Sequence, residues 1–182
     1  WEREAHQNNW IWEAVRQLHP EEDDVLVYSD LDEIPDLKRI CDEVVPDLLS
    51  VARLSSHWFH FGWHNYLGEW NDTIWVARCG AVQAARNRDV DLRLIHGETH
   101  PEPMGWHLSF FDMTPEQVRL KIQSYSHHND DRERALLAAG DGEICRRMAA
   151  GGHLFGDAPQ RPFTGPYPRS YTSKTCFCCL DT

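Results

Sequence analysis

The first part of the chain alternates between helical and strand-like patterns. Between residues 2 and 18 apolar side chains recur at helical spacing, which predicts an amphipathic helix that ends at His19–Pro20. The short apolar run Val25–Tyr28 then predicts a buried strand of the parallel type. An acidic loop and a second short helix over residues 36–45 follow. This order indicates an open α/β sheet, whose ligands bind beyond the carboxyl ends of the strands. The predicted apolar face of the first helix consists of Trp10, Ile11, Ala14, Val15 and Leu18.

The second part contains one well-marked helix start and fewer regular patterns. A strand is predicted over residues 73–82 and a loop over residues 91–105. Thr114 and Gln117 form a capping-box pattern around Pro115, which predicts that a helix begins there. The pattern over residues 132–150 predicts a further helical stretch that is interrupted at Gly140. From residue 151 onward the sequence shows no regular pattern. Because no repeat or linker divides the chain, we expect a single domain over residues 1–182 with an irregular tail from about 165.

Charge and composition exclude two classes of partner. The 18 basic residues are outnumbered by 29 acidic ones, which gives a net charge of -11. A nucleic-acid-binding surface needs clustered Lys and Arg, so we expect no nucleic-acid partner. No apolar run approaches the roughly 20 residues that span a bilayer, so we expect no membrane contact within this chain.

The acidic loop Ser29–Pro35 is the sharpest local feature. Alternation in an extended segment would place the Asp30 and Asp32 side chains on one side. Two close carboxylates repel each other unless a cation lies between them, which suits Mg²⁺ or Mn²⁺. A cation held in this way keeps open positions for the phosphate oxygens of a substrate, whose developing charge it would neutralise.

Two other interpretations of the loop stay open. It would simply be an acidic turn that ends a strand and caps the next helix. It also fits a phosphohydrolase of the haloacid dehalogenase type, with Asp30 as nucleophile and Asp32 as acid/base. Pro35 stands where that enzyme class usually has a glycine-rich turn, which weakens the hydrolase alternative.

A second segment, Gly105–Phe111 followed by Thr114–Glu116 and Lys121, changes the picture. Together with Ser29–Pro35 it resembles glycosyltransferase family 17, which includes the animal β-1,4-mannosyl-glycoprotein N-acetylglucosaminyltransferase that makes bisected N-glycans. The segments Asp72–Trp75 and Asp91–Arg93 are similar to that family as well. The resemblance extends from about the first predicted helix to about Tyr171.

The resemblance implies a GT-A-like fold, in which an open mixed sheet is flanked by helices. It also implies a uridine diphosphate donor that carries N-acetylglucosamine, a glycan or glycoprotein acceptor, a divalent metal (Mn²⁺ or Mg²⁺) and inversion at the anomeric carbon. Asp30 and Asp32 would then hold the metal and the diphosphate, and Glu33 would position the donor or Asp32. The compartment would be the Golgi lumen for a eukaryotic member and the cytoplasm for a microbial or viral one.

The second motif supplies the other candidate site residues. His107 would complete the metal shell or donate to a phosphate oxygen, unless it is a hydrogen-bonded core histidine. Its ring is therefore expected in the same cleft as Asp30 and Asp32. Trp106 would stack on a sugar face, and Arg93 would bind the diphosphate.

Inversion requires a carboxylate base on the acceptor side. Glu116 and Asp112 are the candidates because both follow the second motif, and Glu98 and Glu102 come next. Against Glu116, a helix N-terminus stabilises a carboxylate and lowers its basicity.

One departure from the family pattern concerns the N-terminal side. In GT-A folds the elements that hold the nucleobase precede the metal motif, whereas this chain starts only one helix before it. We therefore expect either that this portion is missing from the sequence or that this family member is shortened. A sugar-binding module that has lost catalysis stays a further alternative, which the aromatic residues between 57 and 66 favour.

Overall fold

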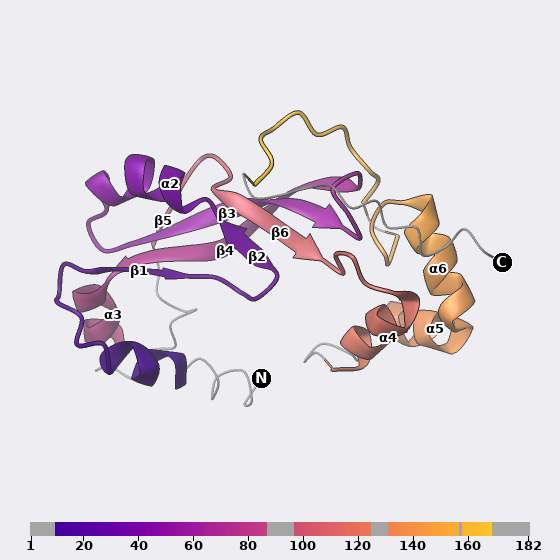
Figure 1. Cartoon of the computed structure of the whole chain (residues 1–182), viewed down its shortest axis with the longest axis horizontal. Helices are drawn as coiled ribbons and strands as arrows, with labels where there is room; N and C mark the ends of the chain where they lie inside the picture. Colours follow the sequence, from indigo (N-terminus) through magenta and orange to yellow (C-terminus); the bar gives the residue numbers. More distant parts are fainter. Residues whose placement is uncertain (1–9, 87–96, 125–130, 157, 169–182) are drawn as a thin grey trace. The chain divides into compact units, whose positions relative to one another are not determined.

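The computed structural model describes residues 10–86, 97–124, 131–156 and 158–168 (Figure 1). Among these residues the strands form an open sheet in the order β1-β4-β3-β6-β2, with β5 paired to β3. β1 and β4 are antiparallel, whereas β3 pairs in parallel with β5 and β6. The predicted α/β class with an open mixed sheet is thereby confirmed. The strands are β1 (Val25–Tyr28), β2 (Glu33–Pro35), β3 (Val51–His60), β4 (Tyr66–Arg78), β5 (Glu98–Thr99) and β6 (Gly105–Ser109).

Helical elements precede, separate and follow the strands in sequence. Residues 10–16 are helical. The other helical elements are α2 (Leu37–Arg39), the π-helical η1 (Ile40–Val44), the 3₁₀ turn η2 (Val45–Asp47), α3 (Cys79–Arg86), α4 (Pro115–Ser124), α5 (Asp131–Ala139) and α6 (Asp141–Ala150). None of the helices in the described ranges is long and apolar enough to span a membrane.

The chain divides into two compact units, and each has its own core. The first unit comprises Trp1–Ser56 and Trp70–Gly105, and the second comprises His57–Glu69 and Trp106–Thr182. The expectation of a single functional domain stays a prediction.

Strand alternation gives the first unit two hydrophobic layers. On one face of β3 and β4, Leu54 and Ile74 pack against η1 and Met104. On the other face, Trp75 and Ala77 pack against Trp12 and Val82 of the flanking helices. Helical elements therefore cover both faces of this part of the sheet, which is why its strands are rich in apolar residues.

Three sequence predictions for the first unit need correction. β1 is a strand, but it is half-buried at the end of the strand order and antiparallel to β4. The predicted strand over residues 73–82 ends at Arg78, where α3 begins. The first helix buries Trp12, whereas Trp10 is 64% and Leu18 80% exposed. A helical pattern allows more than one apolar stripe, and the strands that it meets decide which one is buried.

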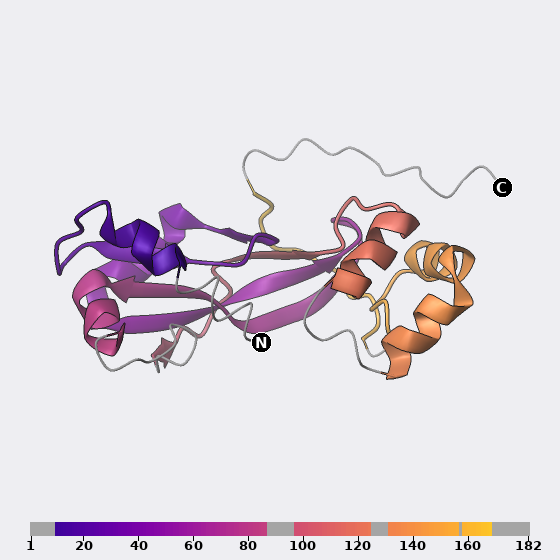
Figure 2. The same ribbon diagram turned by 90° about the horizontal axis from the view of Figure 1, so that it is seen from below.

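The second unit places α4, α5 and α6 around one core (Figures 1 and 2). The predicted capping box is present, since the Gln117 amide donates to Thr114 Oγ1 (3.3 Å) and the Thr114 amide donates to Gln117 Oε1 (2.8 Å). The predicted helical interruption is also present, at Gly140 with φ 83°. The core side chains are Phe61, Phe110, Val118, Ile122, Leu136, Ile144 and Leu154.

A buried asparagine fixes the loop after α6. Gly151, Gly152 and Gly156 all have positive φ, a conformation that L side chains rarely adopt. The Asn65 side chain accepts from the Gly152 amide (2.8 Å) and donates to the Gly152 carbonyl (3.0 Å). Asn65 itself is fully buried. Its amide therefore satisfies two backbone groups that water does not reach.

Replacing Asn65 by alanine should lower the free energy of unfolding by about 2–4 kcal/mol, because both Gly152 backbone groups would lose a buried partner. Chemical denaturation followed by circular dichroism measures the change. Leu120→Ala, at a side chain 64% exposed in the same unit, is the control and should change it by less than about 0.5 kcal/mol. Equal free energies of unfolding for the two variants would show that the hydrogen bonds of Asn65 to Gly152 are not needed for stability.

Candidate functional site

The acidic loop is a tight turn and not the extended segment that alternation suggested. The Glu33 amide donates to the Asp30 carbonyl (3.1 Å), and the Asp30 amide donates to Glu33 Oε2 (2.8 Å). Glu33 is only 7% exposed, whereas Asp30 is exposed and Asp32 half-buried. The buried Glu33 carboxylate folds the chain back on itself, which a sequence pattern of alternating acids does not reveal.

The turn is anchored by the segment that leads into β6. The Asp36 amide donates to the Met104 carbonyl (2.8 Å), and the Asp36 side chain accepts from the Arg39 amide (3.2 Å) to cap α2. A Cβ at Gly105 would lie 2.6 Å from the Ile34 carbonyl oxygen and 2.5 Å from Ile74 Cδ1. The glycine that opens the second motif is therefore required where β2 passes closest.

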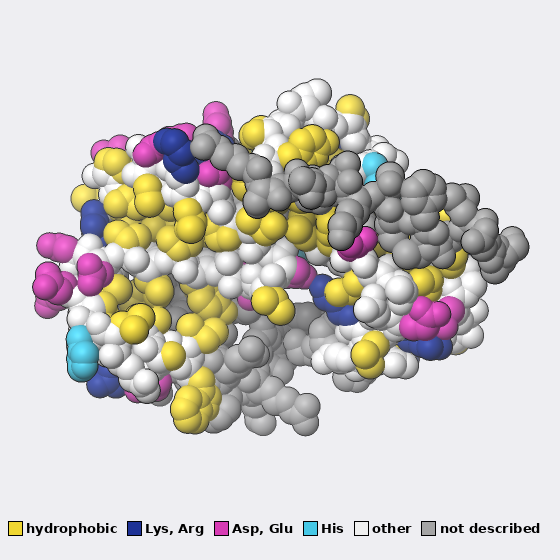
Figure 3. Space-filling view, viewed as in Figure 1, with side chains coloured by type: hydrophobic (Ala, Val, Ile, Leu, Met, Phe, Trp, Pro, Cys, Tyr) yellow, Lys and Arg dark blue, Asp and Glu magenta, His cyan; other side chains and the backbone are white. Residues whose placement is uncertain are grey.

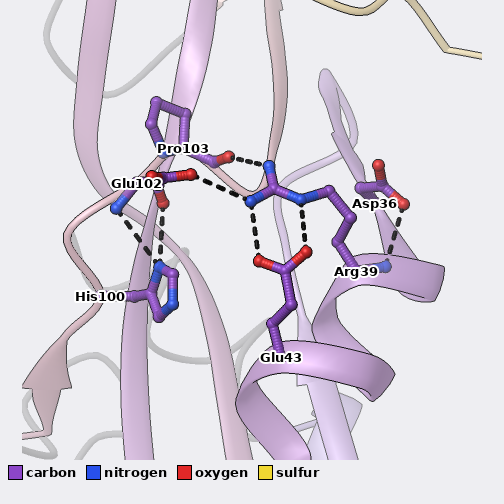
Figure 4. Close-up of polar contacts among 6 residues, drawn as sticks. All are labelled: Asp36, Arg39, Glu43, His100, Glu102 and Pro103. Atoms are coloured by element: carbon purple, nitrogen blue, oxygen red, sulfur yellow. Dashed lines mark hydrogen bonds and ion pairs between the residues drawn. The ribbon is translucent and has the colours of Figure 1, made fainter.

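An arginine network supports the same region (Figure 4). Arg39 forms a two-pronged ion pair with Glu43 (2.9 and 2.8 Å) and also donates to the Pro103 carbonyl (3.0 Å). It forms a further ion pair with Glu102 at 3.2 Å. The Glu43 hydrogen bond is the main cause that raises the pKa of Arg39, and the same bond lowers the pKa of Glu43. Glu102, a reserve candidate for the base, is thus part of a structural network, and Glu98 is exposed on β5.

Hydrophobic side chains accompany the acids of the turn. Leu31 is fully exposed between Asp30 and Asp32, and Ile34 and Leu37 are 39% and 57% exposed. Figure 3 shows hydrophobic side chains gathered on the visible surface of the first unit. Exposed apolar side chains that form a contiguous patch mark interaction or ligand-binding surfaces.

In the second unit, Trp106 and His107 point to opposite faces of β6. Trp106 is 5% exposed, and its indole N–H donates to the Pro166 carbonyl (3.0 Å), so it is a core residue in this structure. The half-buried His107 has its Nε2 2.7 Å from Ser109 Oγ. Ser109 Oγ also accepts a bond from Trp58 Nε1 (2.9 Å).

The two candidate bases differ in their surroundings. Glu116 is exposed in the first turn of α4, where a hydrogen bond from Thr114 is the main cause that lowers its pKa. Asp112 is exposed at a turn with φ 55°, and its amide donates to the Phe61 carbonyl (3.0 Å). Positive φ is uncommon for a non-glycine residue, and Asp is among the residues that adopt it most readily.

The first unit thus contains Asp30, Asp32 and Glu33, and the second contains Trp106, His107, Asp112 and Glu116. That His107 shares a cleft with the two aspartates stays a prediction. Arg93 lies outside the described residues.

Sequence reasoning missed a histidine cluster in the second unit. His60 is 1% exposed, and its ring lies 4.8 Å from that of His153 and 5.0 Å from that of Trp58. Burial, followed by the charges of His153, His107 and Lys121, lowers the pKa of His60 to about 2, so it stays neutral at ordinary pH. His153 also lines a shallow hollow of about 410 Å³ in the loop over residues 150–160. The alternating His and Trp residues between 57 and 64 were the available signal, but their partners depend on strand register.

The side chains of the turn fit a metal that arrives with its substrate. Among the described residues, no three His, Cys, Asp or Glu side chains are grouped so as to hold a metal ion. Mg²⁺ commonly binds through one or two carboxylates, with waters and substrate phosphates as its other ligands. In such an arrangement Asp30 and Asp32 would be the two carboxylates, whereas the Glu33 carboxylate accepts a backbone bond.

Comparison with known families gives one clear result. The sequence profile of glycosyltransferase family 17 matches residues 1–164. No curated protein and no solved structure matches the chain. The family match covers most of the chain and includes both motifs.

The role of Glu33 in holding the turn can be tested with two variants. Glu33→Ala should speed hydrogen exchange at the Asp30 amide by about tenfold or more, because that amide loses its acceptor. Glu33→Gln is the matched control, since it keeps an acceptor oxygen and should retain most of the protection. Hydrogen–deuterium exchange followed by nuclear magnetic resonance measures both, and identical protection in all three proteins would contradict this role.

Proposed function

The chain belongs to glycosyltransferase family 17, and on that premise we propose that it transfers N-acetylglucosamine from a uridine diphosphate donor to a glycan acceptor. Family membership supports glycosyl transfer in general. The observation that carries the finer proposal is the acidic turn, which presents Asp30 and Asp32 directly after β1. We further propose that transfer depends on a divalent metal and inverts the anomeric carbon.

In this mechanism Asp30 and Asp32 would hold the divalent metal, Mn²⁺ or Mg²⁺. When bound, the metal supplies positive charge that offsets the charge developing on the leaving diphosphate. Glu33 acts by holding the turn, because its carboxylate accepts the Asp30 amide. The exposed side chains Leu31 and Ile34 offer an apolar surface beside the phosphates, suited to the rest of the donor.

Asp112 is the better candidate for the base. Its carboxylate would take the proton of the attacking acceptor hydroxyl. The acceptor oxygen then bonds to the anomeric carbon while the bond from that carbon to the diphosphate oxygen breaks, and uridine diphosphate leaves. Glu116 is less suited, because the Thr114 hydrogen bond that lowers its pKa also makes its carboxylate a weaker base.

Each alternative function leaves one feature of the protein without a role. A phosphohydrolase would use the acidic turn but assigns no role to the second motif, and the family match favours transfer. A non-catalytic sugar-binding module would bind glycans without needing Asp32 or Asp112. Nucleotide binding that depends on a metal therefore decides between these classes.

Replacing Asp32 by alanine should abolish the metal-dependent part of the affinity for uridine diphosphate, because one of two metal ligands is lost. Isothermal titration calorimetry with and without Mn²⁺ measures this part directly. Asp42→Ala is the control, since Asp42 is an exposed acid that pairs with Lys38 away from the turn. Unchanged titration of the folded Asp32→Ala protein would remove the metal assignment.

Replacing Asp112 by asparagine should leave donor affinity intact and lower turnover by roughly a hundredfold or more, because the proton acceptor is lost. Glu116→Gln is the comparison and should retain most activity. Transfer to a glycan acceptor under saturating donor measures both variants. Full activity of Asp112→Asn together with inactivity of Glu116→Gln would reverse the assignment.

A further inference from the structure

The hydrogen bonds of Ser109 determine which nitrogen of His107 carries a proton. Ser109 is 8% exposed, and its hydroxyl lies within hydrogen-bond distance of Trp58 Nε1 (2.9 Å) and His107 Nε2 (2.7 Å). An indole N–H only donates, so Ser109 Oγ must accept from Trp58. The hydroxyl proton then has His107 Nε2 as its acceptor, because a buried donor is rarely left without one. His107 Nε2 is therefore the bare nitrogen, and the ring proton is on Nδ1.

Strand register makes this arrangement a fixed property of the second unit. β3 and β6 are parallel, with Trp58 opposite His107 and His60 opposite Ser109. Partners in such a ladder project to the same face, so Trp58, His107 and Ser109 meet without any special loop. The fully buried His60 packs edge-on against Trp58, with the two ring centroids 5.0 Å apart.

A lysine near the cluster favours an anion. Lys121 is among the groups that act on His60, and its amine lies 5.1 Å from the centroid of the Phe110 ring. A cation at this position would be repelled, whereas an anionic oxygen would be attracted. A neutral histidine with its proton on Nδ1 would offer an N–H to such an oxygen once the ligand reaches this nitrogen, which is buried in this structure.

We propose that Trp58 and Ser109 are positioning residues that hold His107 as the Nδ1–H tautomer, so that His107 meets its ligand as a hydrogen-bond donor and not as a metal ligand. The identity of the ligand, a diphosphate oxygen, rests on the proposed function. The tautomer does not, because it follows from the contacts of Ser109 alone.

The tautomer is tested on the free protein. In ¹⁵N-labelled protein, long-range ¹H–¹⁵N spectra should give His107 Nδ1 the shift of a protonated ring nitrogen and Nε2 that of a bare one. His107→Gln identifies the signals among the eleven histidines. Ser109→Ala and Trp58→Phe should both lower the Nδ1–H fraction, whereas Trp10→Phe, at an exposed indole, should not. A wild-type His107 that is protonated on Nε2 overturns the proposal whether or not the variants fold.

The donor role is tested by titration of uridine diphosphate. His107→Gln should weaken binding by about tenfold, and by the same factor with and without Mn²⁺, since the lost bond is to a phosphate oxygen. Loss confined to the Mn²⁺-dependent part would identify His107 as a metal ligand and overturn the proposal. If the wild type binds no uridine diphosphate, the proposed function fails and His107 loses its donor role, while the tautomer measurement still decides whether Trp58 and Ser109 position His107.

Discussion

The parallel pairing of β3 with β6 decides what each face of the second unit contains. Its register sets Trp58 and His60 beside His107 and Ser109 on one face, and His57 and Phe59 beside Trp106 and Leu108 on the other. The first face carries hydrogen-bonded polar rings, and the second is closed by aromatic contacts such as Phe59 with Phe163 at 4.9 Å. If β6 slipped by one residue against β3, its two sets of side chains would exchange faces. Trp106 would then lie among the histidines, and His107 would point toward the aromatic cluster. The chemistry proposed for His107 thus depends on a backbone register and not on a local motif.

Buried polar side chains hold the loops around the candidate residues. Glu33 fixes the acidic turn, Asn65 fixes the loop after α6, and Ser109 orients His107. Each is less than a tenth exposed, and each satisfies a group that burial would otherwise leave unpaired. A polar residue can therefore be essential at a site without touching a substrate. This explains why Asp30 and Asp32, and not the third acid of their motif, are the candidates for metal binding.

Local features were accessible from the sequence, and features that depend on distant partners were not. The Thr114–Gln117 capping box and the helix interruption at Gly140 lie within a few residues and were predicted correctly. The predicted direction of β1 was wrong, because the direction depends on pairing with β4, about fifty positions along the chain. The bond from Trp58 to Ser109 likewise joins residues 51 positions apart. The conformation of the acidic turn was missed for a different reason, since a side chain three residues away competes with the extended backbone.

The candidate carboxylates differ in whether their oxygens already accept hydrogen bonds or form ion pairs. Glu33 accepts a backbone amide, Glu102 pairs with Arg39, and the Glu116 carboxylate is stabilised by Thr114. A carboxylate stabilised in its charged form is a poorer proton acceptor, because any proton that it takes must break those bonds. Asp112 differs, since it is exposed at a positive-φ turn whose backbone is fixed by the bond from its own amide to Phe61. That bond fixes the turn without using the side-chain oxygens of Asp112. A base needs a fixed backbone and carboxylate oxygens that are available to accept a proton. This is the physical reason to look for the proton acceptor at Asp112 before any glutamate.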